Sequence, residues 1–390
     1  MSISMFHANS INMEKKVYIT KTASFFPNEP VKNDEMENFL GLIGNKPSRV
    51  KNIVLRQNGI TQRFYALNTN QEVTHTNARL AALSIKKLFD SEEELNKIEA
   101  LVCATTSPDQ YLPSHAAMVH GELLKKPVEI FSLAGICMCG MHAFKTALMS
   151  IKSNNTHNAV CSTSEVASPG LLSKFYNEEY ESMARVEENP IIAFEKDFLR
   201  FMLSDGASAV LMSDQPPVQG GLEVEWIETI SYANRQPACM YMLAEAMEDG
   251  SLKSWKEFSV EMISEKSVWA VKQNVKLLNS FVVPYFVDAI EYALSRHKTD
   301  LSKVRYVIPH ISSMYFYDRL SNEIESRGIA LTKDKWFTNL TTVGNIASAA
   351  AFAGLDELLR TKPINKGEQI MLLVPESGRF SYGVALLTAL

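Results

Sequence analysis

Two cysteines stand where the chain could build a nucleophile. Cys137 and Cys139 follow a short apolar run, 128–133, and open a stretch to residue 150 in which apolar side chains recur at helical spacing. The N-terminus of a helix stabilises negative charge, so a cysteine there is predicted to have a lowered pKa and a reactive thiolate. The alternative is that both are small, buried core residues, as free cysteines often are.

Two further polar side chains also follow apolar runs, although they lie far along the chain. His310 comes directly after the apolar segment Val304–Pro309, and Asn345 follows Gly344 and precedes a run of small residues. Taken singly, the histidine would be structural and the asparagine a helix cap. Beside a cysteine they suit acyl transfer, in which the thiolate holds an acyl group as a thioester and the other two donate hydrogen bonds to an oxyanion.

A metal site is the other chemistry that these residue types allow. Cys137, Cys139 and His142 include one pair at ligand-like spacing, but no second pair follows in the sequence. We therefore predict no metal.

The elements that must position these residues alternate between buried strands and helices. Apolar runs such as 98–106 and 157–165 are predicted strands, and segments with helical spacing separate them. This alternation predicts an α/β sandwich.

The sequence also predicts two halves of similar architecture. Residues 15–213 carry the cysteines and 219–390 carry the histidine and asparagine, after an N-terminal extension at 1–14. In the second half we expect a helix at 284–295, with Pro284 in its first turn, where the missing N–H of proline costs nothing.

The composition restricts the class of protein. With 390 residues, 46% of them hydrophobic, the chain can bury a large core. A net charge of −5 gives no overall attraction to nucleic acid or to an anionic membrane. Five cysteines without a regular framework fit a reducing compartment, and the sequence has neither a signal peptide nor 18 uninterrupted apolar residues. We expect a cytoplasmic protein with no membrane segment and no nucleic-acid partner.

Seven short motifs, in order along the chain, carry a resemblance to a known family. They are NGITQR (58–63), YLPSHAA (111–117), FSLAGIC (131–137), LSDGASAVL (203–211), VIPH (307–310), GNIASAA (344–350) and SGRFSYG (377–383). The chain resembles the β-ketoacyl-acyl-carrier-protein synthase III group of the thiolase superfamily over nearly its whole length from Lys16. The resemblance implies a duplicated α/β fold of five layers, two sheets between helices, in a homodimer. It also implies acyl carrier protein and acyl thioesters as partners, without a cofactor.

Carried onto this sequence, the family's catalytic triad falls on Cys137, His310 and Asn345. Its oxyanion hole falls on the backbone N–H groups of Cys137 and Gly378. The nucleophile segment departs from the family, which usually has Cys-x-Gly-Phe, whereas residues 137–140 here read CMCG. Either cysteine could therefore be proposed; the distance from the strand at residue 131 and the spacing to the acidic residue 165 favour Cys137.

The same resemblance places Leu112, Glu376 and Phe380 at the substrate pocket. Leu112 stands where relatives limit the length of the acyl pocket, and leucine in place of an aromatic residue predicts a longer or bulkier acyl group. Glu376 replaces an aromatic residue in the loop before Gly378. If it faces the cavity, burial would raise the pKa of its carboxyl and suit it to shuttle a proton during ring closure. An outward-facing, solvated carboxylate is the alternative.

This sequence lacks two residues with which members of the family usually recognise coenzyme A. No tryptophan occurs near 48–55 to stack on adenine, and Tyr315 stands in the region where relatives carry an arginine, with Arg319 farther on. We therefore expect a carrier protein to deliver both substrates.

The predicted function is a Claisen-type condensation. Cys137 would accept an acyl or β-ketoacyl group, and His310 and Asn345 would stabilise the enolate or oxyanion of a second thioester. The segments 198–206 and 375–383 resemble ketosynthases of dialkylresorcinol and stilbene-type pathways, which join two β-ketoacyl chains and cyclise the product. One alternative is an acyltransferase that acylates an alcohol or amine with the same triad. Another is a non-catalytic ketosynthase-like partner, against which the complete triad argues.

Overall fold

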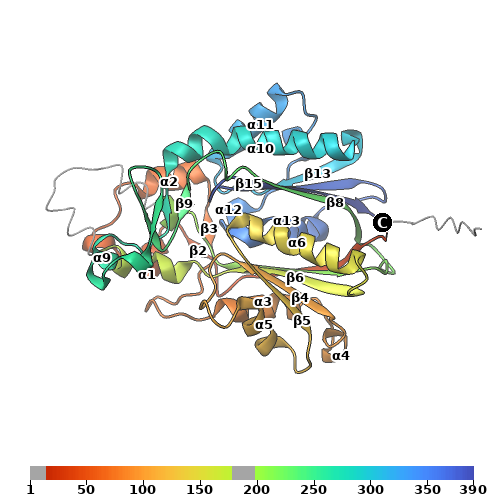
Figure 1. Cartoon of the computed structure of the whole chain (residues 1–390), viewed down its shortest axis with the longest axis horizontal. Helices are drawn as coiled ribbons and strands as arrows, with labels where there is room; N and C mark the ends of the chain where they lie inside the picture. Colours follow the sequence, from red (N-terminus) through yellow and green to blue (C-terminus); the bar gives the residue numbers. More distant parts are fainter. Residues whose placement is uncertain (1–14, 178–197) are drawn as a thin grey trace, which may run out of the picture.

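The computed structural model describes residues 15–177 and 198–390, so the extension expected at 1–14 lies outside the described residues. Nine strands hydrogen-bond in the order β13-β14-β15-β8-β1-β7-β6-β4-β5. They are β1 Tyr18–Phe25, β4 Ala100–Thr105, β5 Glu129–Ala134, β6 Asn158–Glu165, β7 Gly206–Ser213, β8 Leu222–Ser231, β13 Val304–Pro309, β14 Gln369–Glu376 and β15 Ser381–Ala389. Only two residue pairs join β1 to β8, so the strands fall into two half-sheets, one above the other in Figure 1.

The two half-sheets repeat one pattern of pairing. In the first, β1–β7 and β7–β6 are antiparallel and β6–β4 is parallel. In the second, β8–β15 and β15–β14 are antiparallel and β14–β13 is parallel. The strand β5, which adds parallel to β4 at the outer edge, has no counterpart among the described strands of the second half. This extra strand leads directly into the helix that carries Cys137.

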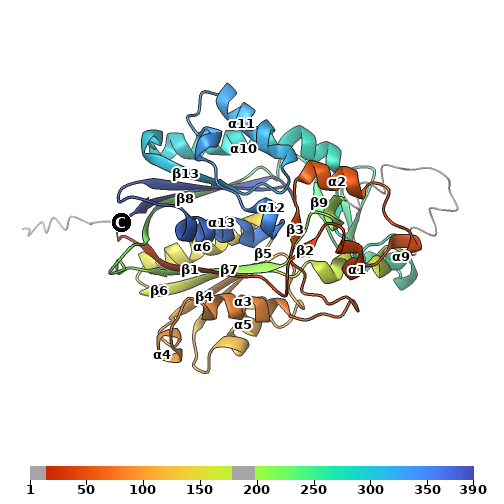
Figure 2. The ribbon, with the colours of Figure 1, turned by 180° about the vertical axis from the view of Figure 1, so that it is seen from behind.

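Helices complete five layers, with α6 and α13 between the half-sheets and one helix pair on each outer face (Figures 1 and 2). The long helices are α3 Asn77–Lys86, α5 His115–Leu123, α6 Cys137–Lys152, α10 Val275–His297, α11 Tyr315–Ser326 and α13 Ala350–Thr361. The pair α3 and α5 covers the first half-sheet, and the pair α10 and α11 covers the second. The expected α/β sandwich with five layers is confirmed.

Apolar side chains point to both faces of the central strands, which explains why helices cover both faces of each sheet. In β4, Val102 belongs to the core cluster around α6, whereas Leu101 and Cys103 belong to the cluster under α3 and α5. In β14, Leu372 faces the central layer and Leu373 faces α10. Successive side chains point to opposite faces of a strand, so a run that is apolar throughout needs cover on both sides.

The helix expected at 284–295 is longer than predicted. It begins at Val275, where the side chain of Asn274 accepts a hydrogen bond from the N–H of Leu277 (3.0 Å), and Pro284 lies in its interior. The expectation was wrong because packing of α10 on the sheet outweighs the hydrogen bond that an internal proline removes. By length and composition α10 is long and apolar enough to cross a membrane, and 44% of its most apolar part is buried inside this fold, where the helix packs on β14 and β15.

Short elements occupy the periphery (Figure 1). They are α1 Met36–Leu40, α2 Lys51–Asn58, α4 Glu92–Leu95, α9 Val260–Glu265, α12 Leu340–Val343, β2 Val31–Lys32, β3 Gln62–Arg63, β9 Met240–Tyr241, β10 Ala244–Ala246, β11 Leu252–Ser254 and β12 Lys272–Gln273. Several of them, among them α1, α2, α9, β2 and β9, gather at one end of the molecule (Figure 1).

Candidate active site

Cys137 is the first residue of α6 and comes three positions after the end of β5. The helix packs tightly in the central layer, because a side chain at Gly140 would lie 2.4 Å from the backbone oxygen of Ser348. Glycine at this position therefore lets the nucleophile helix approach the segment that carries Asn345. Cys137 is only 8% exposed, and Cys139, one position past Met138, is fully buried in the same core.

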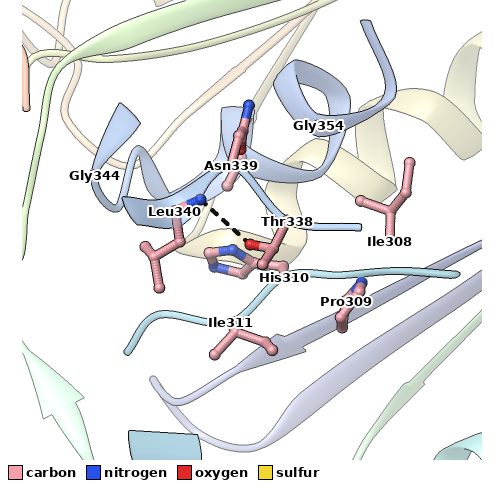
Figure 3. Close-up of a pocket in the computed structure, with 10 residues that line it drawn as sticks. Ile308, Pro309, His310, Ile311, Thr338, Asn339, Leu340, Gly344 and Gly354 are labelled. Carbon is pink, nitrogen blue, oxygen red and sulfur yellow. Dashed lines mark hydrogen bonds between the residues drawn. The ribbon is translucent and has the colours of Figure 1, made fainter. Parts of the chain in front are cut away.

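His310 follows the last residue of β13 and is held to the neighbouring strand. Its backbone N–H donates to the carbonyl of Leu373 in β14 (2.8 Å), which fixes the point where the histidine leaves the sheet. The imidazole is buried between the end of β13 and the segment 338–340 (Figure 3), and Nε2 has no hydrogen-bond partner in the described part of the chain. Burial lowers the pKa of His310 to about 4, so the ring is neutral at neutral pH.

Asn345 lies in a turn between α12 and the short 3-10 helix Ala347–Ala349. Its backbone N–H donates to the carbonyl of Met202 (3.2 Å), and its own carbonyl accepts from the N–H of Ser204 (2.9 Å). Gly344 before it has a φ of +78° and would place a Cβ 2.7 Å from Ser204, so glycine is required there. The side-chain oxygen of Asn345 accepts from the N–H of Ala347 (3.0 Å), which leaves its amide N–H groups free to donate.

Cys137 and His310 open into one cavity whose walls are largely apolar. The cavity encloses about 480 Å³, including its open mouth. Its other lining residues come from α10, α11, the segment after β13 and the end of β14 with the residue that follows it: Leu278, Val282, Val283, Phe286, Ile311, Ser312, Phe316, Leu320, Pro375 and Ser377. The wall from α10 and α11 was not foreseen from the sequence, because both helices present similar apolar residues to the core and to the cavity.

Gly378 lies opposite the start of α6. A Cβ on this glycine would lie 2.4 Å from the side chain of Ile136, the residue before the nucleophile. Its carbonyl accepts hydrogen bonds from the N–H groups of Cys239 and Met240, which hold the loop in place. The loop therefore packs against the residue before Cys137, and the oxyanion hole at the N–H groups of Cys137 and Gly378 stays a prediction.

Glu376 is partly buried against the start of α6 and is not the fully solvated loop carboxylate that the sequence left open. One oxygen, Oε2, accepts hydrogen bonds from the backbone N–H groups of Ile136 (3.3 Å) and Met138 (3.1 Å), on either side of Cys137. Burial raises the pKa of Glu376 above its ordinary value, although these two hydrogen bonds act in the opposite direction. It is absent from the lining of the apolar cavity, whereas its neighbours Pro375 and Ser377 contribute to it.

The expected low pKa of the nucleophile was wrong. Burial raises the pKa of the Cys137 thiol well above its ordinary value, and the carboxylates of Glu376 and Glu165 add to this effect. The helix N-terminus does stabilise negative charge, but Glu376 already occupies the amides that would stabilise a thiolate. The resting nucleophile is therefore a neutral thiol.

Glu165 connects the segment after β4 to the turn that holds Asn345 through hydrogen bonds. Its carboxylate accepts from the side chains of Thr106 (2.8 Å) and Ser107 (2.9 Å) after β4, and from the N–H of Ser348 (3.3 Å) beside Asn345. The sequence marked Glu165 only by its spacing from the cysteine. The structure shows that it joins the cysteine-bearing half to the asparagine turn.

Two predicted pocket residues lie elsewhere in the single chain. Leu112 is 86% exposed and does not line the cavity, because it precedes α5 on the outer side of the first half-sheet. Phe380 is fully buried but packs edge-on against Phe281 and Tyr285, so it supports the Gly378 loop from behind. No group of three His, Cys, Asp or Glu side chains within 15–177 and 198–390 is arranged to hold a metal ion.

Comparisons with known proteins agree with this fold. Residues 294–388 match the family model described as 3-oxoacyl-[acyl-carrier-protein] synthase III C terminal. The chain is 24% identical to a β-ketoacyl-[acyl-carrier-protein] synthase III of Clostridium acetobutylicum, over 95% of this chain and 98% of the relative. It is 25% identical to the protein of that name from Natranaerobius thermophilus, over 86% and 89% of the two chains.

Two solved structures show the same fold. OleA of Xanthomonas campestris superposes with a TM-score of 0.73 and 17% identity, covering 96% of this chain and all of OleA. AbyA1, a tetronic acid condensing enzyme, superposes with a TM-score of 0.71 and 16% identity, covering 95% and 99%. This chain therefore shares its five-layered fold with OleA and with the condensing enzyme AbyA1. The chain resembles the β-ketoacyl-acyl-carrier-protein synthase III-like family over nearly its whole length.

Proposed function

We propose that this enzyme loads an acyl group on Cys137 and joins it to a second acyl thioester by Claisen condensation. The observation that carries the proposal is the shared cavity, in which Cys137 and His310 stand beside apolar walls from α10 and α11. Such walls suit an alkyl chain, because each methylene removed from water contributes about 0.8 kcal/mol. His310, neutral at neutral pH, and the amide of Asn345 would donate hydrogen bonds to the oxyanion of the second substrate.

A carrier protein is the proposed source of both thioesters. The relatives from Clostridium and Natranaerobius carry acyl carrier protein in their names. Arg319, the nearest arginine after His310, donates to the side chain and carbonyl of Asn279 and to the hydroxyl of Tyr315. These bonds leave little of its guanidinium to bind a coenzyme A phosphate.

The proposal includes a homodimer. The edge strand β5 has partly exposed residues along most of its length, although it leads into the nucleophile helix. An exposed edge strand is an available pairing surface for another chain. Tyr111 and Leu112 are also exposed, at 67% and 86%, and Leu112 could limit an acyl pocket only if it reached a second copy.

Intact-protein mass spectrometry tests the proposal directly. The protein is incubated with a panel of acyl-carrier thioesters, and Cys137→Ser serves as the control that cannot form the thioester. We expect a stable mass increase in the native protein alone, followed by its loss and a new carbon–carbon bond when a second thioester is added. Analysis of the released product then shows whether the chain is open or has closed to a cyclohexanedione or resorcinol ring. Transfer of the acyl group to an alcohol or amine without condensation would refute the proposal.

A further inference from the structure

The carboxylate of Glu376 lies beside the backbone that carries Cys137. Its Oε2 is fixed by the two amides that flank Cys137. Its Oε1 lies on the side of Gly378, where a Cβ would come within 3.3 Å of it, and accepts no hydrogen bond from any described residue. At the start of α6, Oε2 is therefore held by two hydrogen bonds, whereas Oε1 accepts none from the described residues.

Negative charges on Glu376 and on Cys137 would oppose each other. The Cys137 thiol is buried and Glu376 is partly buried, and the carboxylate raises the pKa of the thiol. Two adjacent groups of this kind titrate as a pair, because the charge of one raises the pKa of the other. A thiolate therefore forms most readily when the carboxylate becomes neutral in the same step.

The other titratable groups near Cys137 are poor proton acceptors. His310 lines the same cavity, and burial lowers its pKa to about 4, so its ring accepts a proton less readily than an ordinary imidazole. Glu165 is occupied by hydrogen bonds from Thr106, Ser107 and Ser348. Cys139 is a buried neutral thiol.

We propose that Glu376 takes the proton of the Cys137 thiol during acyl loading and returns it to the departing carrier thiol. The sulfur of Cys137 attacks the thioester carbonyl as its proton moves to Oε1, and a tetrahedral oxyanion forms. When the carbon–sulfur bond to the carrier breaks, the carrier thiolate takes the proton from the neutral carboxyl. The carboxylate is regenerated, and the net charge of the site is the same before and after. This assignment rests on the proposed function and adds a catalytic residue to it.

The experiment measures single-turnover acylation of Cys137 by intact mass in three variants. Glu376→Gln keeps an oxygen that can accept from Ile136 and Met138, but it removes the base. Glu376→Asp keeps a carboxyl on a shorter side chain. Glu228→Gln is the matched control, because Glu228 is a buried carboxylate on β8 bound to Arg296 and His297 and is not part of the cavity. Thermal melting shows that each variant is folded.

We expect Glu376→Gln to load an alkyl thioester about a hundredfold more slowly than the native protein, since proton transfer typically contributes at least this factor. The loss should shrink with a thiophenyl ester, because an arylthiolate leaves without needing a proton. It should also shrink at alkaline pH, where hydroxide can take the thiol proton. Glu376→Asp should recover part of the rate, and Glu228→Gln should load normally.

Undiminished loading by Glu376→Gln would contradict the assignment. If Glu376 acts only as a buried charge, its removal lowers the pKa of Cys137, and Glu376→Gln should load as fast as the native protein or faster. That outcome would overturn the assignment while leaving the proposed function intact. A native protein that takes up no acyl group from either donor would instead refute the proposed function, and the assignment with it.

Discussion

The apolar cavity predicts which acyl chains the enzyme accepts. Val282 lies on α10 and lines the cavity together with Cys137. In Val282→Phe the side chain gains four carbon atoms, which take the place of about four methylenes of a bound chain. At about 0.8 kcal/mol for each buried methylene, the longest accepted chains lose about 3 kcal/mol. Since 1.4 kcal/mol is a factor of about ten, kcat/KM for those chains should fall about two-hundredfold.

Short acyl groups should be nearly unaffected, because they do not reach the added ring. The assay compares kcat/KM for loading over a series of acyl lengths in the native protein, in Val282→Phe and in Ser295→Phe. Ser295 is exposed on the same helix, so this control adds the same ring outside the cavity. A larger side chain in a packed region also costs about 1–3 kcal/mol of stability, so the melting temperature is measured in parallel. A length profile that falls uniformly, or not at all, would show that the acyl chain binds elsewhere.

Three further predictions follow from the site. Asn345→Ala should still form the Cys137 thioester but condense about a hundred- to a thousandfold more slowly, as expected for loss of one oxyanion donor; a folded variant that cannot be acylated would contradict this division of roles. Peptide mapping should find the acyl group on Cys137, which lines the cavity, and an adduct on the enclosed Cys139 would contradict the assignment. Burial lowers the pKa of His310 from 6.5 to about 4, so the unfolded state binds more protons between these values and His310 should reduce stability by up to about 3 kcal/mol as the pH falls through them. Urea unfolding of the native protein and His310→Gln at pH 4.5 and 7 measures this, and equal slopes with pH would show that the imidazole is not buried as a neutral group.

The sequence alone determined the parts of the protein that depend on local pattern. Alternating apolar runs and helical spacing predicted the α/β layers, because burial on both faces of a strand leaves a continuous apolar run. The positions of Cys137, His310 and Asn345 after apolar runs were also visible, since each one lies at the end of a predicted element. The resemblance over seven motifs then indicated the family that the comparisons support.

Tertiary structure determined how far these residues are buried and which charged groups lie near them. The sequence predicted a low pKa for Cys137 from its helix position, but burial of the thiol, aided by Glu376 from 239 positions later in the chain, raises that pKa instead. Electrostatic shifts depend on burial and on neighbours within a few ångströms, and sequence spacing carries neither. In the same way, the cavity between α10 and α11 and the exposure of Leu112 follow from how helices pack on sheets. The sequence alone does not distinguish an apolar residue that fills a core from one that lines a cavity or faces solvent.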